Sequence, residues 1–327
     1  MTYSKFTFLI FFSCLLFSCK SNSKEPKTTS VPEQKEATNI NDSETDTNAN
    51  EYTTHNVSWS EIESFEKVPF DFLVYYGEDS LHFGELRTPL SQKDTFPLVI
   101  YIHGGCWLDA YNLDYVSTVA DDLVKDGYAV WVPEYRRVGN VGGGYPNTFK
   151  DIQASVDFAR TLAEIYPLDL DRVVIMGHSA GGHLALWSAA QSNLPKNSRL
   201  YNPNPLSVKG IIALAGITDL TAYDKIGNSC STAVPKLMGG DSDKMNARYF
   251  KSSPINLLPT GIPIRMIHGQ LDNIVPLSQS EAFVEKAKAA GDDVTMLMIE
   301  GGGHFDMASP YSEAWKVVKQ ELKKLLE

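Results

Sequence analysis

Three residues that could together perform nucleophilic catalysis occur along the chain in the order Ser179, Asp272 and His304. A serine hydroxyl is a weak nucleophile until a base removes its proton. A neutral imidazole can be that base near neutral pH, and a carboxylate can orient the imidazole and stabilise it once it is charged. The three side chains therefore have the groups needed to attack a carbonyl carbon, provided that the fold brings them together.

Ser179 lies in the segment GHSAG (177–181), between an apolar, β-branched run at 173–176 and a stretch that suits a buried helix. A serine at such a junction could simply cap the helix. Gly177 and Gly181 favour a nucleophile elbow instead, because residues without side chains let strand and helix approach closely around a strained residue. We interpret Ser179 as a nucleophile if the rest of the chain supplies a base, an acid and oxyanion donors.

Asp272 and His304 both directly follow expected strands, at 264–267 and 294–299. In a parallel α/β sheet ligands bind beyond the carboxyl ends of the strands, so reactive residues should follow strands directly. Either residue alone could be an ordinary turn, cap or loop residue. The order serine, aspartate, histidine is typical of an α/β-hydrolase triad and predicts one here. Asp219 is an alternative acid, although its position favours the start of a helix.

A glycine-containing turn after another strand could supply the oxyanion donors. His103-Gly104-Gly105 follows the apolar segment LVIYI. We expect the backbone N–H groups of Gly104 and Gly105, with that of Ala180 directly after the nucleophile, to face a developing oxyanion. His103, His178 and His183 are interpreted as structural.

From Glu66 onward, strand and helix patterns alternate, which predicts an α/β fold with a mostly parallel central sheet and helices on both faces. The first two strands form a hairpin and should be an antiparallel edge. We expect strands over 70–76, 81–87, 98–102, 128–132, 173–176, 210–214, 264–267 and 294–299, and helices over 116–125, 152–165, 279–290 and from Ser312.

Two segments interrupt this alternation. Residues 218–258 show little periodicity and are the best candidate for an insertion over the site. Residues 139–146 (GNVGGGYP) are rich in glycine but lack the Gly-Lys-Ser/Thr that follows in a phosphate-binding loop. We interpret the second segment as a flexible wall of the substrate cleft.

The N-terminal residues have the pattern of an export signal. Lys5 precedes an apolar run at 6–17, which is too short to span a bilayer but typical of a signal peptide. The run ends in Ser18-Cys19, which resembles the bacterial lipoprotein box, where the cysteine is lipidated; an ordinary signal peptide with an incidental cysteine is the alternative. We predict a lipoprotein signal peptide over 1–19, a disordered polar tether over 20–55 and an α/β-hydrolase domain over 56–327.

The composition of the chain disfavours several classes of partner. The formal net charge of −11 and the lack of any basic run disfavour nucleic acids and anionic membrane surfaces, while 43% hydrophobic residues suffice for one large core. The seven histidines show no metal-ligand spacing, and we expect neither metal nor organic cofactor. Export would permit a disulfide between Cys106 and Cys230, but a single pair is no disulfide framework, and the sequence favours two unpaired thiols.

Five segments in order resemble the α/β-hydrolase superfamily, in particular the esterase/lipase-type enzymes that include kynurenine formamidases and bacterial carboxylesterases. They are HGGCW (103–107), EYRRVGNVGGGYP (134–146), GHSAGG (177–182), HGQLDNIVP (268–276) and GGGHFD (301–306). The resemblance covers the chain from about residue 65 onward and implies that Ser179 is the nucleophile, Asp272 the acid and His304 the base, with the amides of Gly104, Gly105 and Ala180 in the oxyanion hole. The chain has HGGCW where the hormone-sensitive-lipase-like branch has HGGG.

The leading hypothesis is therefore a serine hydrolase that cleaves a small carboxylic ester through an acyl-enzyme on Ser179. The same side chains would serve an amidase, an arylformamidase or an exopeptidase-like enzyme, because the pocket selects the leaving group. A non-catalytic binding protein on the same fold is the alternative from another class. The expected partners are a small ester or amide and a membrane, reached through a lipid anchor at Cys19.

Overall fold

The computed structural model describes residues 56–91, 94–228 and 230–327. The predicted signal peptide, the lipidation site Cys19 and the polar tether lie outside the described residues. Within the described ranges, no helix is both long enough and apolar enough to cross a bilayer.

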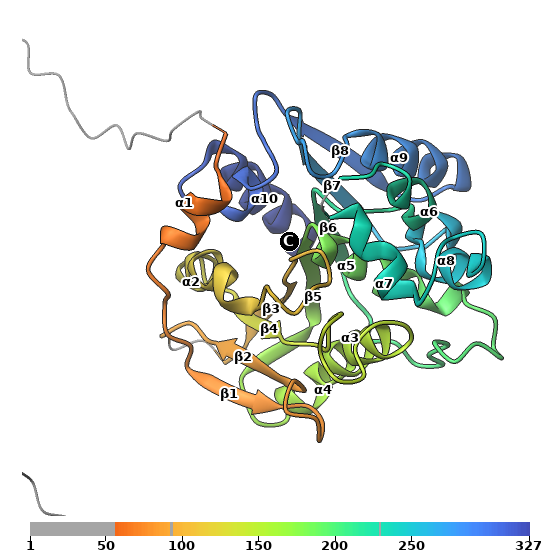
Figure 1. Cartoon of the computed structure of the whole chain (residues 1–327). Helices are drawn as coiled ribbons and strands as arrows, with labels where there is room; N and C mark the ends of the chain where they lie inside the picture. Colours follow the sequence, from red (N-terminus) through yellow and green to blue (C-terminus); the bar gives the residue numbers. More distant parts are fainter. Residues whose placement is uncertain (1–55, 92–93, 229) are drawn as a thin grey trace, which may run out of the picture. The chain divides into compact units, whose positions relative to one another are not determined.

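One eight-stranded sheet forms the centre of the described domain (Figure 1). The strands are β1 (Phe72–Tyr75), β2 (Phe83–Arg87), β3 (Phe96–Ile102), β4 (Ala129–Pro133), β5 (Leu168–His178), β6 (Gly210–Leu214), β7 (Ile264–Gly269) and β8 (Val294–Ile299). Across the sheet they lie in the order β1-β2-β4-β3-β5-β6-β7-β8. All eight strands expected from the sequence are present, and β5 is longer than its apolar run indicated, because it begins in the polar stretch that pairs with the start of β3.

The sheet is parallel except at one edge. β1 pairs with β2, and β2 with β4, in antiparallel fashion. The other neighbouring strands run parallel. This confirms the prediction of a mostly parallel sheet with an antiparallel edge. It also brings the carboxyl ends of β3, β5, β7 and β8 to the same edge of the sheet, where the predicted reactive residues begin.

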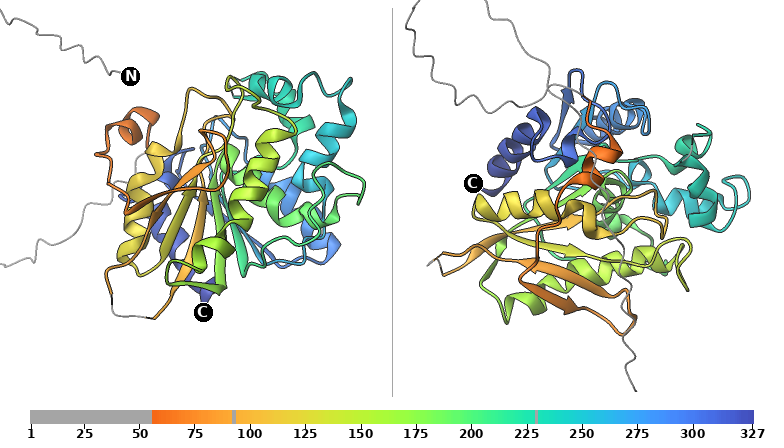
Figure 2. Two further views of the ribbon diagram at one scale, coloured as in Figure 1. Left: turned by 90° about the horizontal axis from the view of Figure 1, so that it is seen from below. Right: turned by 60° about the vertical axis from the view of Figure 1, so that its left-hand side comes forward.

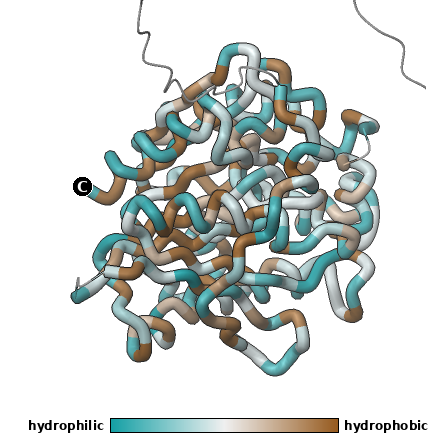
Figure 3. Tube along the Cα trace, turned by 90° about the vertical axis from the view of Figure 1, so that its left-hand side faces the viewer, coloured by the Kyte–Doolittle hydropathy of each residue, from teal (hydrophilic) through white to brown (hydrophobic). Residues whose placement is uncertain are grey.

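The sheet separates two hydrophobic cores. In β3 the side chains of Leu98 and Ile100 join the core on one face, and those of Val99 and Tyr101 join the core on the other. This follows from strand geometry, because successive side chains of a strand point to opposite faces. The hydrophobic stretches of the chain accordingly gather in the middle of the domain (Figure 3).

Helices cover both faces of the sheet (Figure 2). On one face lie α2 (Ser117–Lys125) and α10 (Glu313–Leu326). On the other lie α3 (Asn147–Asp157), α4 (Ala159–Ala163), α5 (Ala180–Ala190) and α9 (Ser278–Ala290). A short helix, α1 (Trp59–Ser64), precedes the sheet, and short 3-10 helices occur at Leu113–Val116, Gln191–Asn193, Ser231–Ala233, Pro254–Asn256 and Asp306–Ala308.

The helix expected over 152–165 is wrong in its start and in its continuity. The chain becomes helical earlier, at Asn147, and α3 and α4 are separated at Phe158. The indole N–H of Trp131 donates to the carbonyl of Ser155 at 3.1 Å, and a continuous helix would use this carbonyl to accept from Ala159. A tertiary contact therefore divides a segment whose periodicity indicated one helix.

The segment 218–258 contains three short helices, α6 (Leu220–Asp224), α7 (Val234–Met238) and α8 (Asn246–Ser252). Asp219 caps α6, because its carboxylate accepts hydrogen bonds from the backbone N–H groups of Thr221 and Ala222. The structure therefore confirms the helix-start role of Asp219 that its position favoured over a role as the acid.

Candidate active site

Ser179 lies on a sharp turn between β5 and α5, with φ 57° and ψ −120°. A Cβ at Gly177 would lie 2.2 Å from the carbonyl oxygen of Gly181, and a Cβ at Gly181 would lie 2.0 Å from that of Ile102. Both contacts are too close for any side chain, as the sequence predicted. Although Ser179 is the residue before α5, its side chain forms no capping hydrogen bond. The simple capping interpretation is therefore wrong.

Asp272 and His304 meet as predicted, although 31 residues separate them. The Nδ1 atom of His304 donates to Oδ2 of Asp272 at 2.7 Å, and both side chains are buried. The other carboxylate oxygen accepts the backbone N–H groups of Ile274 at 2.9 Å and Val275 at 2.8 Å. The carboxylate is thus held from two sides, and its bond fixes the tautomer of His304.

Asp272 is an anion at neutral pH. Burial alone would raise the pKa of its carboxyl group. Hydrogen bonds from His268 and His304 outweigh burial and bring the pKa of Asp272 below its ordinary value. His268, whose Nε2 lies 3.2 Å from Oδ2 of Asp272, is a contact that the sequence analysis did not anticipate.

Ser179 and His304 line the same cavity, which has a volume of about 210 Å³. In the described structure the hydroxyl of Ser179 and Nε2 of His304 form no hydrogen bond with each other; such bonds are often long in unliganded sites and shorten when substrate binds. The cavity wall is largely aromatic and apolar. It consists of Trp59, Gly105, Cys106, Tyr111, Tyr115, His178, Ser179, Cys230, Ile274, His304 and Phe305.

The three predicted oxyanion donors differ in their surroundings. The N–H of Gly104 donates to the Tyr115 hydroxyl at 2.6 Å, and Gly104 is buried. The N–H groups of Gly105 and Ala180 have no acceptor among the described residues, and Gly105 lines the cavity. Gly104 is therefore a correction to the sequence analysis: its amide is engaged by a tyrosine that no local pattern indicated.

The turn after β3 is closed by a disulfide between Cys106 and Cys230, whose Cα atoms are 5.2 Å apart. This corrects the expectation of two unpaired thiols. The two cysteines are 124 residues apart in sequence, and the fold brings the turn after β3 next to the segment that follows α6. Both cysteines line the cavity, so the disulfide is part of the wall.

A chain of hydrogen bonds runs from this turn to the His304 loop. The Tyr115 hydroxyl, which accepts from Gly104, lies 3.2 Å from Nδ1 of His178. The Nε2–H of His178 in turn donates to the carbonyl oxygen of His304 at 2.9 Å. Burial, with a further contribution from nearby His304, lowers the pKa of His178 to about 3, so its ring is neutral and can accept from the tyrosine.

The remaining histidines near the site have the structural roles expected of them. His103 lies beneath the oxyanion turn, with Nε2 3.0 Å from a carboxylate oxygen of Glu134 and its ring stacked on Tyr135. His183 accepts the indole N–H of Trp107 at 3.2 Å and donates to the carbonyl of Ser252 at 2.7 Å. Both rings are fully buried and hold the backbone around the site in place.

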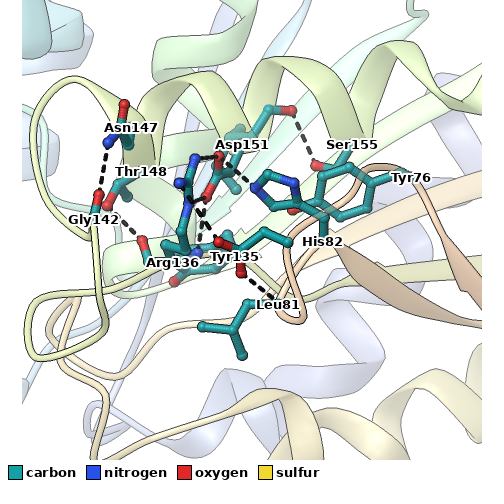
Figure 4. Close-up of polar contacts among 12 residues, drawn as sticks. Tyr76, Leu81, His82, Tyr135, Arg136, Gly142, Asn147, Thr148, Asp151 and Ser155 are labelled. Carbon is teal, nitrogen blue, oxygen red and sulfur yellow. Dashed lines mark hydrogen bonds and ion pairs between the residues drawn. The ribbon is translucent and has the colours of Figure 1, made fainter.

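The glycine-rich loop at 139–146 does not line the cavity next to Ser179, which corrects its interpretation as a cleft wall. Figure 4 shows how the loop is fastened to α3 and to the turn before it. Thr148 accepts the N–H of Gly144 at 3.0 Å and donates to the carbonyl of Arg136 at 2.6 Å. Asp151, also on α3, binds the Arg136 guanidinium and His82 of the first hairpin.

A larger depression, of about 660 Å³, lies elsewhere on the domain, where Lys67, Thr118 and Tyr311 contribute to its wall. It contains none of the predicted catalytic residues. Within residues 56–327, leaving aside the undescribed positions, no group of three histidine, cysteine or acidic side chains is arranged to hold a metal ion.

Several wall residues were not indicated by the sequence. Trp59 comes from α1, outside every motif, and Tyr111 and Tyr115 follow the oxyanion turn without any recognisable pattern. Phe305 could have been found, since it directly follows His304. Aromatic residues are common in hydrophobic cores, so sequence alone does not separate those that line a site from those that fill a core.

A serine on a strained strand-to-helix turn, in one cavity with the histidine of a buried aspartate–histidine pair on this strand order, is typical of the α/β-hydrolase fold. Comparison with known families agrees. The family model described as BD-FAE matches residues 85–287, and the chain belongs to that family.

Relatives of this chain carry esterase and formamidase names. It is 25% identical over 244 residues to Esterase LipC of Mycobacterium tuberculosis, across 72% of this chain and 59% of that protein. It is 32% identical over 266 residues to kynurenine formamidase avaC of Aspergillus versicolor, across 69% of this chain and 87% of that protein. A solved structure, the truncated form of a carbohydrate esterase from gut microbiota, shares the fold with a TM-score of 0.68, at 23% identity over 79% of this chain and 96% of that one.

The chain thus spans little more than half the length of LipC. Its membership of the BD-FAE family rests on the family match, whereas the formamidase is a relative most of whose length is covered.

Proposed function

We propose that this protein is a serine hydrolase that cleaves small carboxylic esters through an acyl-enzyme on Ser179. One observation carries the proposal. His304, bonded to buried Asp272 at 2.7 Å, shares a cavity with a serine held at φ 57°. Esterase names among the relatives support the same reaction class.

The reaction proceeds in two steps. The hydroxyl oxygen of Ser179 attacks the carbonyl carbon, and its proton passes to Nε2 of His304. The imidazolium that forms is stabilised by Asp272, and it protonates the leaving alkoxide as the ester C–O bond breaks. A water molecule then loses a proton to His304 and attacks the acyl-enzyme. The imidazolium returns that proton to the oxygen of Ser179 as the bond between this oxygen and the acyl carbon breaks and the acid is released.

The negative charge on the carbonyl oxygen requires hydrogen-bond donors during both steps. The N–H groups of Gly105 and Ala180 are the donors available for it, because neither has another acceptor in the described chain. Donors already fixed in place stabilise the transition state without reorganisation, and each contributes about a hundredfold or more to the rate. The engaged amide of Gly104 acts indirectly, through Tyr115.

The cavity favours a small and largely apolar substrate. Its volume of about 210 Å³ is below the roughly 300–1,000 Å³ typical of sites for drug-sized ligands. Phe305, Ile274 and Tyr111 contribute an apolar wall, and the polar groups are concentrated at Ser179 and His304. A short acyl group bound to a compact alcohol fits this description.

Replacement of the nucleophile tests the proposal. Ser179→Ala is expected to lower hydrolysis of p-nitrophenyl acetate by at least about 10⁴-fold and to abolish labelling by a fluorophosphonate probe. Ser188→Ala is the matched control on the same helix, because its hydroxyl bonds only the carbonyl of Ala185 and should leave both signals intact. A folded wild-type protein that neither reacts with the probe nor hydrolyses short esters would indicate a binding protein instead.

An arylformamidase is the second candidate, and the kynurenine formamidase relative favours it. The same nucleophile would attack a formyl carbon and expel an aromatic amine. The aromatic wall at Trp59 and Phe305 could contact that amine. A kcat/KM for N-formylkynurenine well above that for p-nitrophenyl acetate would establish this activity, and the reverse ratio would favour the esterase.

We further propose that the protein is exported and anchored by a lipid on Cys19. The basic Lys5, the apolar run at 6–17 and the Ser18-Cys19 pair support this. The Cys106–Cys230 disulfide supports export, because disulfides persist in oxidising compartments.

Metabolic labelling with an alkyne fatty acid tests the anchor. The wild type should be labelled and recovered with membranes, and Cys19→Ala should be neither. Cys14→Ala is the matched control and should behave as the wild type. Labelling that survives Cys19→Ala would contradict the proposal.

A further inference from the structure

The segment that precedes the sheet is docked on the loop of the predicted catalytic base. The backbone N–H groups of Val57 and Gly303 both donate to Oδ2 of Asp306, at 3.1 and 2.8 Å. Val57 and Ile62 are buried and pack with Ala308 in a small hydrophobic cluster. These contacts place α1 against the turn that carries His304. They lie outside the region matched by the family model, which begins at residue 85.

Within this segment, Trp59 reaches both sides of the catalytic cavity. Its ring lies 5.4 Å from that of Tyr111 and 5.5 Å from that of Tyr115, both in edge-to-face geometry on the oxyanion side. It also lies 5.4 Å from the ring of Phe305, next to the base. Ring pairs in such arrangements attract each other in addition to burying their surface. The three ring contacts therefore hold the indole between the oxyanion side and the loop of His304.

A second cavity, of about 270 Å³, shares Tyr111, Tyr115 and Trp59 with the catalytic cavity. The rest of the second cavity comes from α1 and from the chain around the start of α2. This part includes Ile62, Asn112 and Thr118.

We propose that Trp59 is a specificity-determining residue: its indole is the partition that limits the catalytic cavity to short acyl groups, and the space behind it accepts a longer chain when the indole is removed. This inference rests on the proposed esterase activity and names the substrate class of that site. Of the three rings that line both cavities, Trp59 alone comes from α1. The two tyrosines belong to the chain after the oxyanion turn, and Tyr115 also binds Gly104 there.

The selectivity of Trp59→Ala tests the partition. Wild type and variant are compared on p-nitrophenyl acetate, butyrate, hexanoate and octanoate, so that the leaving group is constant. The ratio of kcat/KM for octanoate to that for acetate should rise at least about tenfold in the variant, because a few additional methylene groups that find a pocket change binding by this order or more. Trp59→Phe, which keeps a ring at the partition, should give an intermediate ratio.

Two control variants separate this role from general damage. Ser64→Ala changes α1 at an exposed residue that lines neither cavity, and Phe250→Ala removes an exposed aromatic side chain on α8. Both should keep the wild-type ratio. Thermal unfolding and circular dichroism establish that each variant is folded. A folded Trp59→Ala protein with an unchanged ratio, or with equal loss on all four esters, would overturn the inference.

A binding measurement keeps this test independent of turnover. The binding affinities of butyrate and octanoate are measured by thermal shift or calorimetry in two proteins. One carries Ser179→Ala alone, and the other carries Ser179→Ala with Trp59→Ala. Octanoate should bind more tightly only when the indole is absent, and equal affinities in the two proteins would overturn the inference. If the wild type hydrolyses no ester, the proposed function fails, and this measurement still decides the role of Trp59.

Discussion

Two neighbouring turns of this protein reach unusual backbone geometry by different means. The nucleophile turn follows β5 and the oxyanion turn follows β3, and these two strands are paired in parallel. The nucleophile turn has one residue with positive φ, Ser179, with a glycine two positions to either side. In the oxyanion turn Gly105, Cys106 and Trp107 all have positive φ, at 101°, 53° and 57°, and two of them carry side chains.

The difference lies in what keeps each turn strained. At the nucleophile turn the constraint is backbone packing: Gly177 lies against the backbone of Gly181, and Gly181 lies against the backbone of Ile102 and His103. At the oxyanion turn, contacts from distant parts of the chain hold the backbone: the disulfide from Cys230 and the hydrogen bond from Tyr115. Strain persists only where the surroundings over-determine it. The nucleophile turn should therefore tolerate the loss of distant side-chain contacts, and the oxyanion turn should not.

The largest expected effect comes from breaking the nucleophile turn sterically. In Gly181→Ala the new Cβ would overlap the carbonyl oxygens of Ile102 and His103, which are backbone atoms and cannot rotate away. We expect a loss of about 3 kcal/mol or more in the free energy of unfolding, measured by urea denaturation. Gly291→Ala is the control: no atom lies near the new methyl group, and the only expected loss is the cost of a side chain at its positive φ, about 1–2 kcal/mol. Equal losses would contradict the steric account.

The next effect comes from removing the disulfide. Cys106→Ala with Cys230→Ala should lower the free energy of unfolding by about 2–5 kcal/mol, because the bond closes a long loop. It should also lower kcat by about tenfold to a hundredfold through displacement of the oxyanion amides. Labelling of Ser179 by a fluorophosphonate, followed at saturation, should still go to completion. An unchanged kcat would show that Tyr115 and His103 suffice to hold the turn.

Acid should weaken the oxyanion turn through His183. Burial lowers the pKa of His183 to about 4, whereas in the unfolded chain it is about 6.5. Between these values the unfolded chain binds the proton and the folded protein does not. Neutral His183 therefore makes its full contribution to the free energy of unfolding above pH 6.5. This contribution is lost as the pH falls towards 4, by up to about 1.4 kcal/mol per pH unit.

Comparison of urea unfolding at pH 7 and pH 5 measures this loss. In His183→Gln the dependence of stability on pH should be shallower than in the wild type, although the variant is less stable at pH 7. Burial also lowers the pKa of His178, to about 3. His178 therefore adds to the dependence of stability on pH equally in the wild type and in His183→Gln. Identical slopes in wild type and variant would rule out His183 as the source.

The smallest expected effect comes from removing a single hydroxyl, that of Tyr115, which contacts the oxyanion turn. Tyr115→Phe keeps the ring beside Trp59 but removes the acceptor of the Gly104 N–H and the donor to His178. We expect kcat to fall by roughly threefold to tenfold, in line with the loss of about 1 kcal/mol per hydrogen bond, while KM for a short ester changes little. Tyr111→Phe, which removes a hydroxyl from the same wall, is the control. A fall in kcat equal in both variants would assign the effect to cavity polarity.

Much of the fold could be predicted from sequence, because the strands and the longer helices have clear periodicity. The positions of Asp272 and His304 directly after their strands also sufficed to predict that these two residues meet. Two predictions that failed, on helix 152–165 and on the Gly104 amide, share a physical cause. Helix 152–165 is divided by a hydrogen bond from Trp131, and the Gly104 amide is taken by Tyr115. Both are tertiary contacts of side chains that leave no periodic pattern.

The sequence by itself determined the α/β sheet, the strained serine and the aspartate–histidine pair, because strand periodicity, flanking glycines and position after a strand are local properties. Only the tertiary structure decided the cysteine pairing, the state of the Gly104 amide and the place of Trp59 at the cavity. Each of these depends on which distant segments become neighbours when the sheet forms. The physical reason is that a close contact between remote residues is set by topology and packing, to which many sequence positions contribute at once.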